Sequence, residues 1–161
     1  MPNLVDIQIG QLLQEGGLKL VLAESCTGGL VGSRITDVPG SSEYFLGGVI
    51  AYAYEAKVDL LGVSWATLNT QGAVSRETVL EMVRGVRNRM KADIAVSVSG
   101  IAGPGGGTPE KPVGTTWIGL AAEAGEWAQV YQFSKDREGN KALAAEAALQ
   151  LLLDYLQNKQ M

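Results

Sequence analysis

Apolar residues recur along this chain with two different periods, and the two periods predict different elements. Leucine and isoleucine at helical spacing predict a helix over residues 3–15, which two glycines at 16–17 end. A continuous apolar run over residues 18–23 is typical of a buried strand. Residues 45–52 are rich in β-forming side chains and predict a second strand, in which two glycines indicate a bulge or a close backbone approach.

The same patterns predict four further elements in the middle of the chain. Short helices are expected over residues 28–36 and 55–61. Ser75 is a good helix N-cap, and apolar residues recur at helical intervals over 79–90, so we expect a longer helix with one buried stripe. Residues 94–98 form another apolar run and predict a strand.

The last third of the chain begins with a loop and ends with a helix. Residues 100–114 are rich in glycine and proline and predict a long loop. Runs over 115–122 and 127–133 flank a short turn and predict a hairpin, and leucines from residue 141 onward predict a C-terminal helix. This mixture predicts an α/β fold: a three-layer-like sandwich with a mixed β-sheet flanked by helices.

The composition is that of one ordinary globular domain over residues 1–161. The chain is long enough to bury a core, and its 46% hydrophobic and 19% charged residues are close to the average for such domains. No apolar run is long enough to span a bilayer, and the N-terminus lacks the pattern of an export signal. We therefore expect a cytoplasmic protein with no membrane partner.

Charge and two residue counts exclude several functions. The net charge of −4 argues against a nucleic-acid partner, because binding phosphates needs a basic face. With no histidine and one cysteine, the chain is not expected to hold a zinc or transition-metal site. The single cysteine permits no intrachain disulfide and suits a reducing compartment.

The segment Ala-Glu-Ser-Cys-Thr-Gly-Gly at 23–29 places a candidate nucleophile between a strand and a helix. Ser25 can there project its hydroxyl toward a pocket beside a helix N-terminus, where backbone N–H groups favour negative charge. The alternative is that Ser25 or Thr27 only caps the helix that begins near Gly28. We expect the neighbouring Cys26 to belong to the core.

Without histidine, a lysine is the natural group to take a proton from Ser25. Lys57 fits this role if it is buried against the Ser25 turn, because burial disfavours the ammonium and lowers its pKa. A solvated lysine is the alternative. Ser99 ends a predicted strand, where its hydroxyl either relays a proton and holds Lys57 or bonds to the backbone.

The loop at 100–114 is long for a compact domain, which favours a function. It matches neither a Walker loop nor a dinucleotide fingerprint, but its glycines can let backbone N–H groups approach an anion. The expected contacts are Gly100, Gly103, Gly105 and Gly106. Arg137 can bind a phosphate or carboxylate through two hydrogen bonds, or simply pair with an acid at the surface.

Five ordered segments carry a resemblance that covers nearly the whole chain: Ala-Glu-Ser-Cys-Thr-Gly-Gly, Pro39-Gly40-Ser41-Ser42, Glu55-Ala56-Lys57, Gly72-Ala73-Val74-Ser75, and Ser99-Gly-Ile-Ala-Gly-Pro with Glu110-Lys111-Pro112-Val113-Gly114. Together they resemble the C-terminal domain of the competence/damage-inducible protein CinA, whose free-standing relatives are nicotinamide-nucleotide amidases of the PncC type. The molybdopterin-binding-like domain that precedes this one in CinA has no counterpart here, so we expect a single-domain form.

The resemblance implies hydrolysis of nicotinamide mononucleotide to nicotinate mononucleotide and ammonia, in pyridine-nucleotide recycling. It implies that Ser25 is the nucleophile, that Lys57 and Ser99 are its catalytic partners, and that the enzyme is a dimer without metal or organic cofactor. We expect N–H groups near Thr27, Gly28 and Gly29 to stabilise the oxyanion. The glycine loop, Arg137 and Tyr52 are expected to contact the nucleotide.

The chain departs from the family pattern at two places. The family often reads Tyr-Ser-Asn before Glu-Ala-Lys, whereas this chain reads Tyr52-Ala53-Tyr54. Near the C-terminus Lys135 replaces a glycine, and Asn140-Lys141 replaces Val-Arg. Two alternatives therefore remain: a non-catalytic nucleotide-binding or regulatory module of the same fold, and a serine–lysine hydrolase that acts on another small amide or ester.

Overall fold

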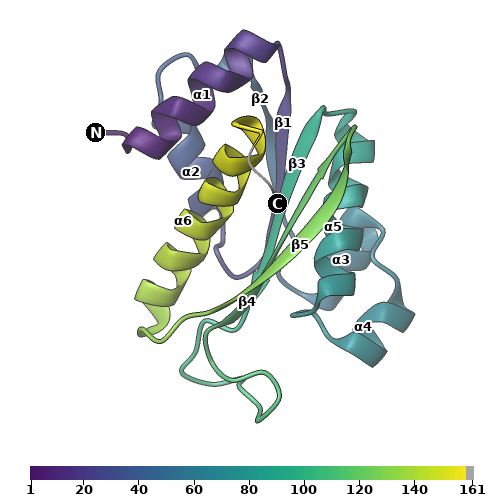
Figure 1. Cartoon of the computed structure of the whole chain (residues 1–161). Helices are drawn as coiled ribbons and strands as arrows, with labels where there is room; N and C mark the ends of the chain where they lie inside the picture. The colour runs from purple at the N-terminus through teal and green to yellow at the C-terminus, as the bar shows by residue number, and fades with distance from the viewer. Residues whose placement is uncertain (159–161) are drawn as a thin grey trace.

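The computed structural model describes residues 1–158, which form a five-stranded mixed sheet with helices on both faces (Figure 1). The sheet order is β2-β1-β3-β4-β5, and β1 pairs in parallel with both β2 and β3. The pairs β3–β4 and β4–β5 are antiparallel. The strands are β1 (Leu20–Glu24), β2 (Phe45–Ile50), β3 (Ile94–Gly100), β4 (Thr115–Ala122) and β5 (Gly125–Gln132).

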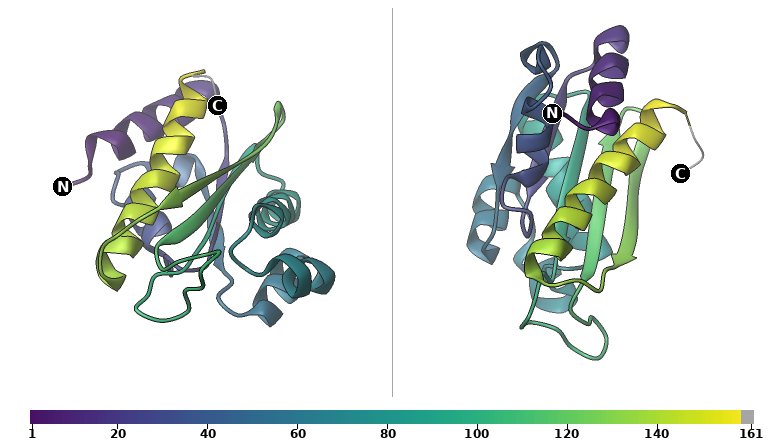
Figure 2. Two further views of the ribbon diagram at one scale, coloured as in Figure 1. Left: turned by 60° about the horizontal axis from the view of Figure 1, so that its bottom comes forward. Right: turned by 90° about the vertical axis from the view of Figure 1, so that its left-hand side faces the viewer.

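Two layers of helices enclose the sheet, and each buries its own apolar cluster (Figures 1 and 2). One layer holds α1 (Leu4–Gly16), α2 (Leu30–Thr36) and α6 (Arg137–Leu156); the other holds α3 (Tyr54–Leu61), α4 (Trp65–Gln71) and α5 (Arg76–Met90). Along β1, Leu20 and Leu22 face the first cluster, while Val21 and Ala23 face the second. A strand covered on both faces is apolar throughout, which explains the unbroken run in the sequence.

The predicted fold class is confirmed, but several element boundaries differ from the prediction and two short elements were missed. The helix α4 was not predicted, because Leu68 is its one buried residue and leaves no apolar stripe to recognise. The helix α6 begins at Arg137 rather than near residue 141, because Asp136 caps it by accepting a hydrogen bond from the Gly139 N–H group. The second strand ends at Ile50, two residues earlier than expected. A short 3₁₀ turn (Ser41–Glu43) was also not predicted.

The parallel strands bring distant segments of the chain to one edge of the sheet. Glu24 at the end of β1 is in register with Ile50 of β2 and Val98 of β3. The residues that follow these positions therefore lie side by side, at the end of the sheet where the loop over 100–114 hangs (Figure 1). The space beyond the carboxyl ends of parallel strands is where α/β folds place their ligands. No helix within residues 1–158 has the length and apolar character to cross a membrane.

Candidate active site

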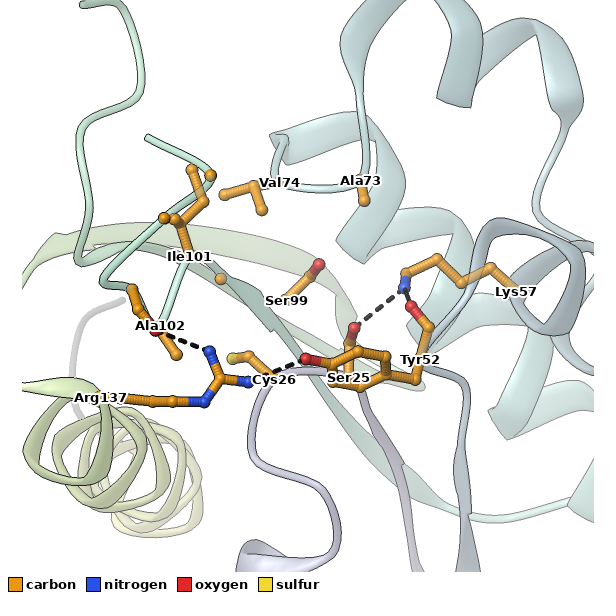
Figure 3. A pocket seen from close by; sticks show the side chains of 14 residues that line it. Ser25, Cys26, Tyr52, Lys57, Ala73, Val74, Ser99, Ile101, Ala102 and Arg137 are labelled. Atoms are coloured by element: carbon orange, nitrogen blue, oxygen red, sulfur yellow. Dashed lines mark hydrogen bonds between the residues drawn. The ribbon is translucent and has the colours of Figure 1, made fainter. Parts of the chain in front are cut away.

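A pocket of about 250 Å³ opens at this edge of the sheet (Figure 3). Its lining comes from the ends of β1 and β3, the segments after β2 and α4, helix α3, the glycine loop and the start of α6. The lining residues are Ser25, Cys26, Tyr52, Lys57, Ala73, Val74, Ser99, Gly100, Ile101, Ala102, Gly103, Gly105, Gly106 and Arg137. Nine of the residues expected from the sequence are thus brought together; Thr27, Gly28 and Gly29 do not line the pocket.

Lys57 meets Ser25 at the floor of this pocket. The lysine lies on α3 and is 1% exposed, and Ser25 is 7% exposed. Lys57 Nζ donates hydrogen bonds to Ser25 Oγ at 2.9 Å and to the carbonyl oxygens of Ala51 and Tyr52 at 2.9 and 2.8 Å. The residues after β2 therefore supply two of the three acceptors, which explains why this lysine must follow that strand closely.

Burial sets the protonation state of Lys57. It lowers the pKa of the amine from 10.5 to about 8, because no solvent stabilises the ammonium, and the nearby Cys26 opposes the shift only in part. A neutral amine keeps two N–H donors and gains one lone pair. The two carbonyls can hold the two N–H groups, which leaves the lone pair for Ser25. The arrangement is therefore suited to removing a proton from Ser25 Oγ.

Ser99 and Cys26 occupy the same pocket without joining this hydrogen-bond set. Ser99 is 1% exposed and points toward the space beside Ser25 and Lys57 (Figure 3). The three bonds of Lys57 Nζ all go to other acceptors, so Ser99 does not hold this lysine. Burial raises the pKa of the Cys26 thiol to about 11. A neutral thiol is a poor nucleophile. Of the two candidate nucleophiles, Ser25 is therefore favoured over Cys26, because only Ser25 is hydrogen-bonded to Lys57.

The turn after Ser25 is held by its own backbone and by Glu24. The Gly28 N–H group donates to the Ser25 carbonyl at 3.1 Å, and the Gly29 N–H group donates to Glu24 Oε1 at 3.2 Å. The Thr27 hydroxyl also donates to Glu24 Oε1, at 2.6 Å. Two of the expected oxyanion donors are thus already engaged. The sequence could not indicate this, because it specifies neither the geometry of the turn that engages Gly28 nor the orientation of the Glu24 carboxylate that engages Gly29.

Arg137 and Tyr52 lie at the mouth of the pocket (Figure 3). Arg137 is the first residue of α6, and its guanidinium donates to the Gly103 carbonyl at 2.7 Å and to the Tyr52 hydroxyl at 3.1 Å. Among residues 1–158 it forms no ion pair with a carboxylate. The alternative expectation, that Arg137 pairs with a surface acid, is therefore wrong among these residues. The positive charge of Arg137 remains available to a ligand.

Asn140 fixes the relation between α6 and the glycine loop. It is 3% exposed, its Nδ2 donates to the Ala102 carbonyl at 3.0 Å, and its Oδ1 accepts from the Lys135 N–H group at 2.9 Å. Two of the three positions at which the chain departs from the family pattern here, Lys135 and Asn140, therefore belong to one loop anchor, which does not include Lys141. The other departure, Tyr54, packs against Trp65 with ring centroids 6.3 Å apart and does not line the pocket.

The site prediction missed five lining residues, Cys26, Ala73, Val74, Ile101 and Ala102, of which Ala73, Val74 and Ile101 form one apolar side of the pocket (Figure 3). Ala73 and Val74 belong to a turn whose Gly72 carbonyl accepts from the hydroxyls of Ser75 and Thr78. The signal for this side of the pocket is the segment Gly72-Ala73-Val74-Ser75, one of the five that carry the family resemblance. Residues 1–158 hold no cluster of three or more histidine, cysteine, aspartate or glutamate side chains that could bind a metal ion.

Fold and site together define a small α/β protein with a buried serine–lysine pair at the carboxyl edge of its sheet. A model of the CinA C-terminal domain matches residues 4–156. The chain is 55% identical over 151 residues to a competence-damage inducible protein of Halothermothrix orenii and 53% identical over 147 residues to a CinA-like protein of Chlorobaculum tepidum. These matches cover 92% and 88% of this chain but only 36% and 35% of the two relatives, so the chain spans about a third of their length.

Solved structures of similar proteins have the same fold as this chain. The competence/damage inducible protein CihA from Agrobacterium tumefaciens superposes with a TM-score of 0.90 at 37% identity, over 98% of both chains. A CinA superfamily protein from Klebsiella pneumoniae gives a TM-score of 0.92 at 32% identity, over 96% of both chains. The chain belongs to the CinA C-terminal domain family, as the ordered segments predicted.

Proposed function

We propose that this protein hydrolyses the carboxamide of nicotinamide mononucleotide to nicotinate mononucleotide and ammonia, within pyridine-nucleotide recycling. One observation carries the proposal: a fully buried Lys57 amine with a lowered pKa lies 2.9 Å from Ser25 Oγ in an open pocket. A serine paired with a neutral lysine can run acyl transfer without histidine. The family resemblance adds the substrate class.

The first half of the reaction transfers the acyl group to the protein. Neutral Lys57 takes the proton of Ser25 Oγ as that oxygen attacks the carboxamide carbon, and a tetrahedral oxyanion forms. The Lys57 ammonium then gives its proton to the departing nitrogen. The C–N bond breaks, ammonia leaves, and an ester links Ser25 to the nicotinoyl nucleotide.

The second half releases the acid. Lys57 is again neutral and takes a proton from a water molecule as the water attacks the ester carbon. Collapse of this second oxyanion breaks the bond to Ser25 Oγ, which recovers its proton from the Lys57 ammonium. Atoms balance over the cycle, because one water is consumed for each ammonia released, and no cofactor or metal takes part.

The Cys26 N–H group is our candidate for stabilising the oxyanion. Cys26 follows the nucleophile and lines the pocket, and within residues 1–158 its N–H group donates to no backbone carbonyl. Gly28 and Gly29 are less suitable because their N–H groups already have acceptors. One such donor is worth about 3 kcal/mol in enzymes where it has been removed.

The rest of the pocket suits a flat ring with a phosphate tail. Ala73, Val74 and Ile101 offer an apolar side for the pyridinium ring, and Arg137 offers a cation for the phosphate at the mouth. Loop glycines near Arg137 leave room for close approach of backbone N–H groups. We place the reaction in the cytoplasm, in keeping with the free Cys26 thiol, and assign it to a homodimer as in the family.

The test is an ammonia assay with nicotinamide mononucleotide and its riboside. The wild-type protein should release ammonia faster from the nucleotide, because the riboside lacks the phosphate that Arg137 would bind. The Ser25→Ala variant should release none from either. Tight nucleotide binding without turnover would instead favour a regulatory module, and faster release from another amide would favour a hydrolase with a different substrate.

A further inference from the structure

Glu24, the residue before Ser25, is a buried carboxylate without a cationic partner in the described residues. It is 4% exposed, and a polar side chain so deeply buried needs hydrogen-bond partners inside the protein. Four donors surround it. Its Oε1 accepts from Thr27 Oγ1 at 2.6 Å and from the N–H groups of Gly29 and Val31 at 3.2 and 3.0 Å, and its Oε2 accepts from the Gly32 N–H group at 2.9 Å.

These donors connect the end of a strand to the start of a helix. Glu24 is the last residue of β1, whereas Val31 and Gly32 lie in the first turn of α2. Ser25 stands between them, and its N–H group donates to the Val98 carbonyl at 3.0 Å. One side chain thus ties together both ends of the turn that carries the nucleophile.

The carboxylate also occupies the place that an anionic ligand would take. The free N–H groups at a helix N-terminus attract negative charge, and here Glu24 satisfies three backbone N–H groups at the start of α2. The Glu24 carboxylate lies directly beside this helix turn, since a Cβ atom added at Gly32 would be in ordinary contact with Glu24 Oε2 at 3.4 Å. These three N–H groups already have an acceptor and are not free to bind a substrate phosphate.

We propose that Glu24 is a positioning residue that holds the Ser25 hydroxyl against Lys57 and keeps the start of α2 closed to substrate anions. It touches neither the reacting atoms nor the pocket, and it acts only through the turn that it binds. For its kinetic readout the inference rests on the proposed amidase reaction. Its structural content, the link between Glu24 and the Ser25–Lys57 distance, stands without that reaction.

Three variants separate positioning from general stability. Glu24→Gln keeps the side-chain length but replaces one accepting oxygen with an amide nitrogen that cannot accept. Thr27→Val keeps the shape of its side chain and removes only the 2.6 Å hydroxyl bond. Ser64→Ala is the control, because Ser64 caps α4 by accepting from the Thr67 N–H group and lies outside the pocket.

Ammonia release from nicotinamide mononucleotide is measured for each variant, together with thermal unfolding. A nucleophile displaced by a fraction of an ångström reacts more slowly, so kcat should fall about 100-fold in Glu24→Gln and about 10-fold in Thr27→Val, with KM changed less than about 3-fold. Ser64→Ala should keep kcat within about 2-fold although it loses a helix cap. The pH midpoint of the rate should not move, because burial rather than Glu24 lowers the pKa of Lys57.

Wild-type kcat in Glu24→Gln, or a loss of kcat of equal size in Ser64→Ala, would overturn the inference. If Glu24→Gln does not fold, Thr27→Val decides by the same criterion. If the wild-type protein releases no ammonia, the proposed function fails and crystal structures decide this inference. A Ser25 Oγ to Lys57 Nζ separation beyond about 3.5 Å in Thr27→Val would then support it, and an unchanged separation would refute it.

Discussion

Lys57 Nζ donates a hydrogen bond to Ser25 Oγ at 2.9 Å across 32 residues of sequence. The pairing follows from the sheet, because β1 and β2 are parallel neighbours and their carboxyl ends present Ser25 and the segment before α3 at one edge. Among residues 1–158 this buried amine has no carboxylate partner, which is unfavourable for stability and useful for accepting a proton.

Replacing Lys57 should therefore stabilise the fold while removing activity. The pKa of the folded-state amine is about 8, below its usual 10.5, so the unfolded chain binds more protons between these values. Stability then rises as pH increases from about 8 to about 10.5, and the cost of burying the ammonium is fully present at neutral pH. Lys57→Met should raise the free energy of unfolding at pH 7 by about 1–3 kcal/mol, measured by urea titration.

The same titration at high pH provides the control. Near pH 10.5 the wild-type amine is mostly neutral, so the advantage of Lys57→Met should shrink. A Lys57→Met protein that is less stable than wild type at pH 7 would mean that the three hydrogen bonds of Lys57 outweigh its desolvation, contrary to this account.

Ser99 should assist the reaction without being essential. Its hydroxyl faces the pocket, but Lys57 uses its N–H groups elsewhere. We expect Ser99→Ala to lower kcat for ammonia release by about 10-fold, less than the loss of a required proton-transfer group. Inactivation as complete as that of Ser25→Ala would assign Ser99 an obligatory step.

Arg137 should act on substrate binding rather than on the chemical step. Arg137→Gln removes the cation at the pocket mouth and should raise KM for nicotinamide mononucleotide about 10-fold or more, because a charged hydrogen bond to phosphate is worth about 1.5–3 kcal/mol. Its kcat should change little. Arg137→Lys keeps the charge but lacks the planar guanidinium, so its KM should lie between those of wild type and Arg137→Gln.

The riboside, which has no phosphate, is the matched substrate for this prediction. Its KM should be almost the same in wild type and Arg137→Gln. An equal rise of KM for both substrates would show that Arg137 acts by holding Gly103 and Tyr52 in place, through the bonds that it already makes.

Asn140 offers a test of the loop anchor. Asn140→Val introduces the residue that the family often has, and it removes the bonds to the Ala102 carbonyl and the Lys135 N–H group. Unpaired buried polar groups should lower the free energy of unfolding by about 1–3 kcal/mol. Hydrogen exchange should also become faster over residues 100–114; unchanged exchange there would refute the anchor.

The fold class and the location of Ser25 and Lys57 in one pocket could be predicted, because their signals are local or carried by ordered segments. Apolar runs gave the buried strands, and the absence of histidine directed attention to lysine. The meeting of Ser25 and Lys57 needed more, since it depends on β1 and β2 being adjacent, which periodicity does not specify.

Other features had no such signal. The helix α4 buries only Leu68, so its pattern resembles a loop. The engaged N–H groups of Gly28 and Gly29 depend on the orientation of one carboxylate, that of Glu24, for Gly29 and on the turn geometry for Gly28. The link from Arg137 to Tyr52 joins residues 85 positions apart through side-chain tips, which a sequence pattern does not encode.

The most direct test of the central claim is the pH dependence of kcat/KM for ammonia release by wild type and Lys57→Arg. In this account the wild-type rate rises with pH, with a midpoint near the lowered pKa of about 8, because only the neutral amine accepts the Ser25 proton. Lys57→Arg should be inactive throughout, since a guanidinium stays protonated. A wild-type rate that is flat across pH 8, or an active Lys57→Arg protein, would contradict the claim that Lys57 is the base.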